Sequence, residues 1–426
     1  MTGRWRARFF TIWTGQQLSI VGSAAAQFAL VWWLTATTGS PRVLTQATFV
    51  ALLPQAVIGV VTGPLIDRWN RRTIMIVADG FIALVSLWLA YLFWTESLEI
   101  WHVYVVVFAR SIGQGFHRPA MSASTTLMVP RQHYTRIGGL NQTIHGFLAV
   151  VSPALGAWLM SLMPLHGVMM VDVGTAAFAI LPLFFLAIPQ PEAQSVESVK
   201  QQRFVHNVLD GLRFILRWPG ILALLGAASI LKVALIPAFS LLPLLVQGHF
   251  GGGAPEYALF NAMVGGGMLA GGLLLSIWGG FKRKIFTVLT GLTGVGVATT
   301  LLGLTPPGMI WIGVVAVFIT GIMLSLTDGP IAGLLQATVP PQMQGRVFAL
   351  LGSLFNVTTL AGLLIAGPVA EVTGVPFWFL LAGLICTATA IASFFIPALV
   401  HIEDQRPGET LDSSVGRTPE TTAIDP

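Results

Sequence analysis

The chain has 426 residues, of which 54% are hydrophobic and only 9% charged, with a formal net charge of +5 and a mean hydropathy of +0.79. Soluble globular domains carry about 25% charged residues, so this composition excludes an ordinary soluble protein and indicates a membrane protein. The one cysteine, Cys386, excludes an intramolecular disulfide and a thiolate metal cluster.

Apolar stretches long enough to cross a bilayer recur along nearly the whole sequence. A helix needs about 20 mostly apolar residues to span the hydrocarbon layer, and an open sheet would leave its backbone groups without hydrogen bonds in lipid. We therefore expect an all-α integral membrane protein. Twelve spans are predicted, at residues 9–34, 43–66, 73–95, 101–127, 138–162, 167–188, 220–246, 256–279, 285–304, 308–338, 347–370 and 376–399.

The N-terminal sequence "MTGRWRARFF", followed by an apolar run and "SAAAQ", resembles a secretory signal peptide. The apolar run continues through "FALVWWL", which makes the segment long enough to span the membrane. We therefore expect it to remain in the mature protein as the first span.

Lysines and arginines fall into alternate loops when the N-terminus is placed inside the cell. Of the 22 Lys and Arg residues, all but four then lie on the cytoplasmic side: Arg42 lies outside, and Arg110, Arg118 and Lys232 lie within spans. Because positive charge is retained in the cytoplasm, we expect a multi-pass protein of the inner (cytoplasmic) membrane with both termini in the cytoplasm. The pI of about 9.8 then reflects topology, and no nucleic-acid partner is expected.

The chain divides around its longest internal loop. We expect an N-terminal six-helix bundle (1–188), a cytoplasmic linker with an amphipathic helix (189–219), a C-terminal six-helix bundle (220–400) and a disordered cytoplasmic tail (401–426).

The two bundles are expected to be pseudo-symmetric, because the sequence repeats itself. "VPRQHYTRI" (129–137) aligns with "VPPQMQGRV" (339–347) at an offset of 210 residues, at equivalent loops of the two halves. Such internal repeats are typical of secondary transporters.

The loop between spans two and three holds an unusual concentration of charge for this chain. The stretch "GPLIDRWNRR" contains Gly63, Asp67, Arg68, Arg71 and Arg72. The arginines could reach carboxylates or the C-termini of helices. The aspartate could reach the N-terminus of a neighbouring helix. The alternative is a simple positive anchor on the cytoplasmic side.

This loop resembles the corresponding motif of the major facilitator superfamily, whose implied role is a cytoplasmic latch between the two halves. The glycine usual before the basic pair is Asn70 here. The second-half loop "SIWGGFKRK" keeps Gly279, Gly280 and the bases but has no aspartate, so a symmetrical second latch is not expected.

Two further spans extend the resemblance. "RSIGQGFHRPA", with Arg110 and Gln114, resembles the superfamily's fourth-span pattern, and "SPALGA" resembles the Gly-Pro motif of its antiporters. In the latter, Ser152 replaces the motif's glycine, whereas Pro153 and Gly156 match it. The whole chain is most similar to the twelve-span macrolide-efflux permeases and related multidrug exporters.

Polar residues within the spans are candidates for a central pathway. Four polar side chains of span four, spaced at i, i+4, i+7 and i+8, share one face of the helix. This face cannot point toward lipid, because a charge in the membrane interior costs from about 3 to more than 10 kcal/mol. They line a wet cavity or, alternatively, pair within the bundle. The face comprises Arg110, Gln114, His117 and Arg118, and Lys232 of span seven is a further cavity candidate.

Span one adds polar groups along one side, including Gln16, Ser23 and Gln27. A few amides in an apolar surround suit an amphipathic substrate. The alternative is hydrogen bonding between helices.

The deep acids are candidates for carrying protons. Asp328 of span ten is the first choice and Asp172 of span six the second, although either could be structural. Asp79 lies nearer the inner surface and is expected to pair with the arginine-rich loop. The repeat aligns Arg118 with Asp328, and we expect the two to approach when the inner side closes; the alternative is that each contacts its own half.

The predicted function is secondary active export of amphipathic, drug-like compounds by alternating access in exchange for protons, and the resemblance implies macrolides among these compounds. The sequence lacks HExxH, GxSxG and a phosphate-binding GxxxxGK[ST], so neither an enzyme nor a cofactor is expected. A channel would not need two matched halves. A siderophore or metabolite exporter of the same superfamily remains open. We expect the protein to act as a monomer in the bilayer.

Overall fold

The computed structural model describes residues 4–186, 188, 213, 215, 216, 218–339 and 341–403. Most of the expected linker (189–219) and the tail beyond residue 403 lie outside this range. The side chains of residues 59–68, which include Gly63, Asp67 and Arg68, also lie outside the description.

The described residues form helices joined by short turns. The long helices are α1 (Arg4–Thr38), α2 (Pro41–Arg68), α3 (Arg71–Trp94), α4 (Ile100–Met128), α5 (Tyr134–Leu162), α6 (Leu165–Phe185), α8 (Pro219–Ser240), α10 (Ala254–Trp278), α11 (Lys284–Leu304), α12 (Ile310–Thr338), α13 (Pro341–Thr373) and α14 (Val375–Phe394). The short elements are η1 (Arg131–His133), α9 (Leu242–Leu244), η2 (Leu245–His249) and α15 (Pro397–Val400).

Within the described residues, ten helices are long and apolar enough to cross a membrane. These ten coincide with ten of the twelve expected spans. The other two long helices are α2 and α4. α4 carries Arg110 and Arg118 in its interior, and such side chains lower the apolar character by which a span is recognised.

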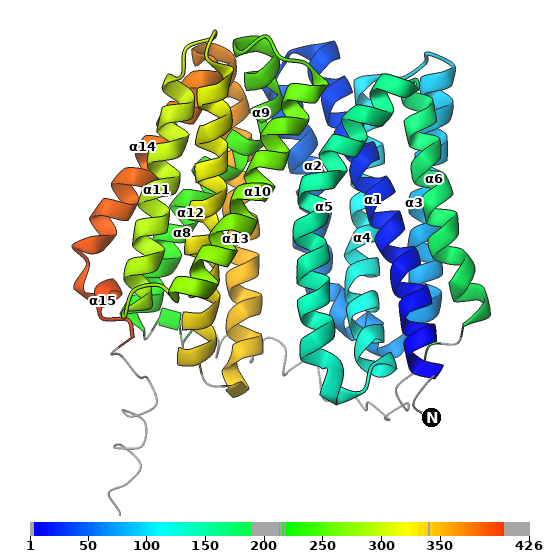
Figure 1. The fold of residues 1–426 in the computed structure, drawn as a ribbon, viewed down its shortest axis with the longest axis horizontal. Coiled ribbons are helices and arrows are strands. Elements are labelled where there is room, and N and C mark those ends of the chain that lie inside the picture. Colours follow the sequence, from blue (N-terminus) through cyan, green and yellow to red (C-terminus); the bar gives the residue numbers. More distant parts are fainter. Residues whose placement is uncertain are drawn as a thin grey trace, which may run out of the picture.

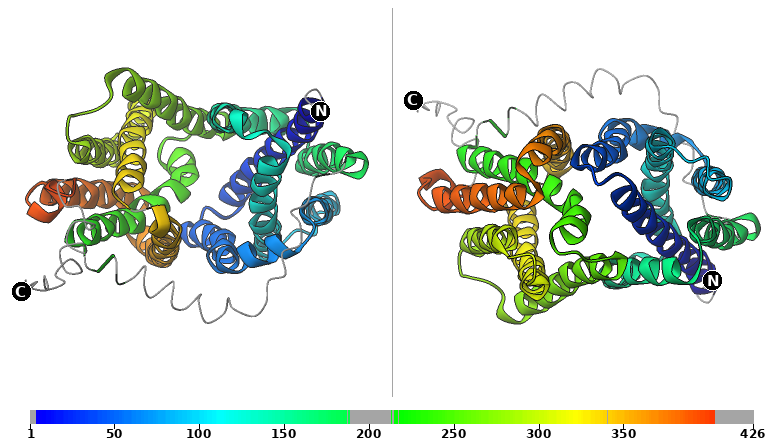
Figure 2. Two further views of the ribbon diagram at one scale, coloured as in Figure 1. Left: turned by 90° about the horizontal axis from the view of Figure 1, so that it is seen from below. Right: turned by 90° about the horizontal axis from the view of Figure 1, so that it is seen from above.

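The helices pack in two groups. In the first, α1 contacts α5 and α6, α3 contacts α4 and α6, and α2 contacts α4; in the second, α11 contacts α12 and α14, α10 contacts α12, and α8 contacts α13 and α14. The groups meet along α2 with α13 and α5 with α10 (Figure 1, Figure 2). We call them the N-half (α1–α6) and the C-half (α8–α14).

Glycines allow very close contacts between helices of the C-half. A Cβ atom on Gly267 of α10 would lie 2.1 Å from the carbonyl oxygen of Phe318, and one on Gly321 of α12 would lie 2.2 Å from that of Val264. Small residues at such contacts let backbones approach in a membrane, where helix association depends on packing. These glycines fix α10 against α12.

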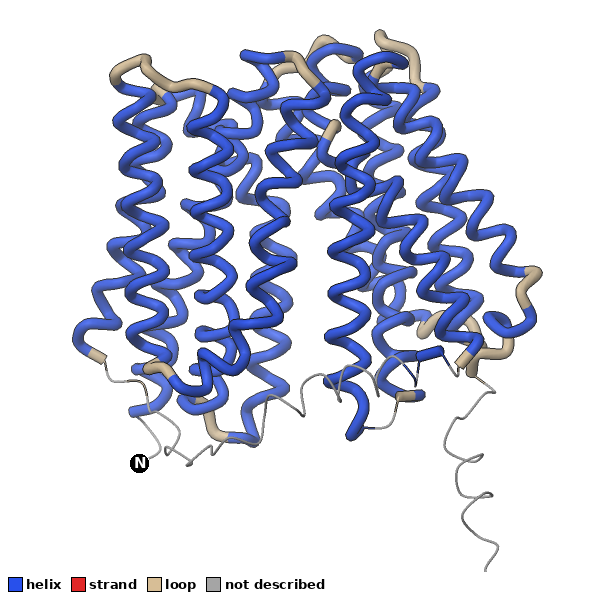
Figure 3. Tube along the Cα trace, turned by 180° about the vertical axis from the view of Figure 1, so that it is seen from behind, coloured by secondary structure: helices blue, strands red, loops and turns tan. Residues whose placement is uncertain are grey.

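The halves lie close together at one end and apart at the other. In Figure 1 the chain begins at the lower end, where α5 and α13 diverge, while the helices of the two halves converge at the upper end. The turns between helices lie at these two ends (Figure 3). Upper and lower are used below in the sense of Figure 1.

Candidate functional site

A cavity of about 690 Å³ lies between the halves, within the ordinary range of about 300–1,000 Å³ for small-molecule sites. Its walls come from α1, α2 and α4 of the N-half and α8, α10 and α13 of the C-half, and they are mainly apolar. Polar groups are few, as expected for a site that takes an amphipathic ligand. They are Gln27, Thr48, Lys232, Ser240, Tyr257, Asn356 and Thr359.

Lys232 is the charged residue in the cavity wall. Its Nζ atom lies 6.0 Å from the ring centroid of Phe355 on α13, and no ion pair of Lys232 occurs among the described residues. A cation over an aromatic face gains about 0.5–2 kcal/mol, less than the cost of a charge deep in a membrane. The carboxyl group of Asp328 on α12 also interacts with this ammonium group electrostatically, and Lys232 lines the cavity, where a ligand can contact it.

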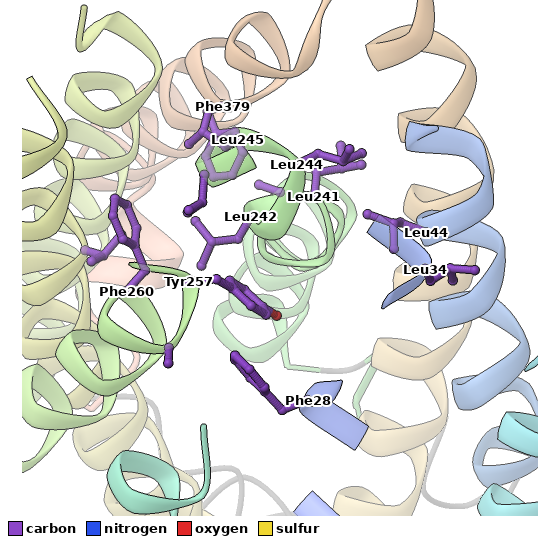
Figure 4. Packing of buried hydrophobic residues seen from close by; sticks show 14 of the residues in the cluster. Phe28, Leu34, Leu44, Leu241, Leu242, Leu244, Leu245, Tyr257, Phe260 and Phe379 are labelled. Carbon is purple, nitrogen blue, oxygen red and sulfur yellow. The ribbon is translucent and has the colours of Figure 1, made fainter. Parts of the chain in front are cut away.

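An aromatic stack closes the space between α1 and α10. The ring of Tyr257 in the C-half lies 5.0 Å from that of Phe28 and 5.9 Å from that of Trp32, with interplanar angles of 16° and 23°. Phe28 and Tyr257 face each other in Figure 4. Both rings belong to one buried hydrophobic cluster, so the stack is a buried contact between the two halves.

The "SPALGA" segment of α5 supports this stack. A Cβ atom on Gly156 would lie 2.8 Å from Cδ1 of Phe28 and 3.1 Å from the carbonyl oxygen of Ala25. Pro153 lies inside α5, and Ser152 is buried. The glycine therefore provides the space in which Phe28 adopts its position.

A second contact joins the halves at the upper rim. Arg42, at the start of α2, forms an ion pair with Glu371, near the end of α13, and both side chains are about half exposed. Below them, a Cβ atom on Gly367 would lie 2.3 Å from Oγ1 of Thr45. Exposed pairs contribute only about 0–1 kcal/mol, so this ion pair adds little beside the buried stack.

The four span-four residues that were predicted to share one face differ in their burial. Arg110 and His117 are buried, whereas Arg118 is exposed and Gln114 is partly buried. Arg118 and Asp328 of α12 are both exposed, and no ion pair joins them in the described part of the chain.

Arg110 pairs inside the N-half. Its Nη1 atom lies 2.5 Å from Oδ2 of Asp172 on α6, and Ser23 of α1 and Ser86 of α3 donate to the two carboxylate oxygens at 2.7 and 2.8 Å. Arg110 also donates to the hydroxyl oxygen of Ser86 and to the backbone carbonyl oxygen of Ser23. Arg110 and Asp172 thus follow the alternative of pairing within the bundle, and neither lines the cavity.

The expected pairing of Asp79 with the arginine-rich loop is wrong. Asp79 lies in the core of the N-half, where Gln16 of α1 donates to its Oδ2 at 3.0 Å and Nε2 of His117 lies 3.2 Å from its Oδ1. The helical position of Asp79, two turns into α3, directs it inward instead of toward the loop. Gln16 and Ser23 thus form hydrogen bonds to other helices, which was the alternative expected for span one. Gln27 is the span-one candidate that lines the cavity.

Two described arginines of the loop, Arg71 and Arg72, donate to backbone carbonyls of neighbouring helices, and for Arg72 these lie at a helix C-terminus, one of the two arrangements expected. Arg72 donates to the carbonyl oxygens of Leu183 and, at 2.7 Å, Phe184 in the last turn of α6, and Arg71 donates at 2.8 Å to that of Ala123 in α4. A cation at a helix C-terminus is favourable. These contacts fasten the start of α3 within the N-half.

Sequence reasoning missed the aromatic part of the site. Phe28, Tyr257 and Phe355 are aromatic residues within apolar spans, and such residues carry no signal that separates a cavity wall from lipid contact. Only Tyr257 could have been identified as a candidate from the sequence. The chain has only four tyrosines, and a tyrosine within a span needs a polar or aromatic environment for its hydroxyl. In the described residues no group of three or more His, Cys, Asp or Glu side chains could hold a metal ion.

The comparisons with known proteins agree with this architecture. A family model described as "transmembrane secretion effector" matches residues 5–414. The chain is 33% identical to macrolide efflux protein A of Streptococcus pyogenes over 91% of this chain and 95% of the relative. It is 23% identical to the multidrug efflux pump Tap of Mycolicibacterium fortuitum over 90% and 94%.

A solved structure has the same fold. A bacterial homologue of the iron transporter ferroportin, in an inward-facing state, superposes with a TM-score of 0.71 at 14% sequence identity, over 92% of this chain and 99% of that one. With the family model covering nearly the whole sequence, the chain belongs to the transmembrane secretion effector family of the major facilitator superfamily.

Proposed function

We propose that the protein exports amphipathic small molecules, macrolides among them, from the cytoplasm across the inner membrane by alternating access. The observation that carries this proposal is the mainly apolar cavity of about 690 Å³ between two groups of helices. The names of the macrolide and multidrug efflux relatives support the substrate class.

In this proposal α2 and α4 also cross the membrane, which makes twelve spans in two six-helix bundles, residues 1–188 and 220–400. Both termini are cytoplasmic, so the lower end faces the cytoplasm. The conformation is then inward-facing, with the upper end held by the stack of Phe28 and Trp32 on Tyr257. Substrate enters the cavity from below, and rocking of the halves exposes it above.

The cavity chemistry supports the way a substrate would bind. Apolar walls take the body of an amphipathic compound, while Lys232 and the amide of Asn356 offer hydrogen bonds to its carbonyl, hydroxyl or carboxylate oxygens. The loss of water from these surfaces supplies the main affinity.

Exchange for protons is proposed through Asp328. This carboxyl group is exposed on α12 in the present conformation, and a proton carrier must reach water on each side in turn. Asp172 is less suited, because its carboxylate oxygens are occupied by Arg110, Ser23 and Ser86. The loop residues Gly63, Asp67, Arg68, Arg71 and Arg72 are proposed to act as a cytoplasmic latch when the lower end closes.

Drug accumulation in an efflux-deficient bacterium tests the proposal. We expect the wild-type chain to lower the accumulation of a macrolide and raise its minimum inhibitory concentration, and a protonophore to abolish both effects. Siderophores, and cationic drugs other than macrolides, are assayed in parallel, because export of siderophores alone would assign the chain to the metabolite exporters.

Lys232→Met and Lys282→Met are matched variants for this assay. Lys232 lines the cavity, whereas Lys282 is exposed in the turn before α11. We expect only the first substitution to change which compounds are exported. Unchanged accumulation of every compound on expression of the wild-type protein would refute the proposed function.

A further inference from the structure

Polar side chains recur at a spacing of seven residues on three helices of the N-half. Seven residues are about two turns, or about 10 Å along a helix, so they form two layers in the interior. The upper layer contains Ser23, Ser86 and Arg110 with Asp172; the lower layer contains Gln16, Asp79 and His117.

The upper layer is complete by its own contacts. The positive charge of Arg110 is balanced by Asp172, and two serine hydroxyls donate to the same carboxylate. Such a buried pair is held by good geometry and additional hydrogen bonds. It has no need of a further ligand.

The lower layer is incomplete. Nε2 of His117 lies 3.2 Å from Oδ1 of Asp79 but is not aligned for a hydrogen bond, and the atom has no such partner among the described residues. Oε1 of Gln16 also lacks one. All three residues are at least nine-tenths buried, and buried polar atoms are normally paired, so two unpaired atoms in one layer indicate a site for a further hydrogen.

No fixed cation balances Asp79. Few other charged groups lie within about two turns of the layer along the packed helices α1, α2, α3, α4 and α6. Arg8, near the start of α1, is partly exposed; the others are Arg71, Arg72, Arg110, Arg118 and Asp172. Of these others, the first two arginines donate to backbone carbonyls, the third is paired with the second acid, and Arg118 is exposed. His117 is therefore the group that can compensate the carboxylate.

Charge balance then sets the number of protons in the layer. A carboxylate beside a neutral imidazole leaves a net charge of −1 in the core, whereas one added proton makes the two groups neutral together. An unbalanced buried charge costs several kcal/mol. We propose that Asp79 and His117 form a proton-binding site in the core of the N-half, separate from the cavity and from Asp328.

The site is connected to the cavity through α1. Asp79 accepts a hydrogen bond from Gln16, and the same helix carries Phe28 and Trp32 to Tyr257. With one proton, the carboxyl group and the imidazole attract each other. A second proton makes Asp79 neutral, which removes its attraction for the imidazolium of His117 on α4 and weakens the hydrogen bond that it accepts from Gln16 of α1.

Infrared difference spectra of the full chain in lipid nanodiscs test the site without a transport assay. Spectra are taken between about pH 8 and about pH 5, the range in which histidine normally changes charge. We expect a protonated-carboxyl band that is lost in Asp79→Asn and kept in Asp328→Asn, and an imidazole band that is lost in His117→Gln. Because interacting groups titrate together, each substitution should also shift the pH midpoint of the partner's remaining band.

His145→Gln is the matched control, because His145 is exposed on α5, and it should leave both bands of the site in place. Asp79→Glu keeps a carboxyl group and should restore a carboxyl band, which covers the case in which Asp79→Asn does not fold. Absence of these bands from the wild-type spectra, or midpoints that stay the same when the partner is replaced, would overturn the proposal, whatever the outcome of the export assays.

Discussion

Replacing Tyr257 with alanine should favour opening of the upper end. Tyr257 stacks on Phe28 and Trp32 across the boundary between the halves. An aromatic pair contributes about 0.5–1.5 kcal/mol beyond area burial, so the two pairs together contribute about 1–3 kcal/mol. In the proposed transport cycle the pairs exist only while the upper end is closed, so their loss should shift the equilibrium toward the open state by about 5-fold to 150-fold.

Labelling of a cavity cysteine from outside the cell measures this shift. Cys386 is first replaced by serine, and a cysteine is introduced at Gln27, which lines the cavity. A membrane-impermeant maleimide then reaches the position only when the upper end opens. We expect Tyr257→Ala to raise the labelling rate by about 5-fold to 150-fold, whereas Tyr257→Phe, which keeps the stacked ring, should stay close to the parent rate.

Equal labelling of the parent and a well-expressed Tyr257→Ala variant would refute the reasoning. It would mean that the stack exists in both conformations, or that the ion pair at the rim holds the upper end closed by itself. Equal acceleration by Tyr257→Phe and Tyr257→Ala would also refute it, because the ring would then contribute nothing.

Three further outcomes are expected. Arg118→Ala and Asp328→Ala should each increase labelling of cysteines along α4 from the cytoplasmic side, and the double variant should show less than the summed effect; strictly additive effects would exclude a gate pair. Asp67→Asn should impair export while membrane insertion stays intact, so normal export by this variant would exclude the latch. Lys232→Met should weaken binding of compounds with a carboxylate by about 5-fold to 150-fold, because a charged contact contributes about 1–3 kcal/mol, and it should leave binding of an uncharged analogue unchanged. Ligand-dependent stabilisation of the protein measures both affinities, and an equal loss for the two compounds would contradict a charge-specific contact.

Much of the fold follows from local sequence properties. Each apolar stretch must be helical in lipid because its backbone has no other hydrogen-bond partner, so helix existence does not depend on the neighbours. Ten of the described helices therefore match ten of the twelve predicted spans, and the family motifs identify the superfamily. The partner of Arg72 is the C-terminus of α6, one of the two kinds of partner expected for the loop arginines.

The polar residues within the spans behaved differently. Helical periodicity places Arg110 and Arg118 on one broad face, yet the first is buried against Asp172 and the second is exposed. A periodic pattern gives a direction around one helix, but it does not identify which helix lies in that direction. For the same reason the sequence could not tell that Asp79 meets Gln16 and His117.

The sequence by itself determined that this chain is a helical membrane protein of the major facilitator superfamily, because helix formation in lipid and short motifs are local properties. Only the tertiary structure decided which side chains line the cavity, which close its upper end and which are enclosed in the N-half. Those roles depend on pairs of residues far apart in the chain, such as Phe28 with Tyr257 and Arg110 with Asp172. They are fixed when helices pack, since packing alone sets the distance between two side chains on different helices.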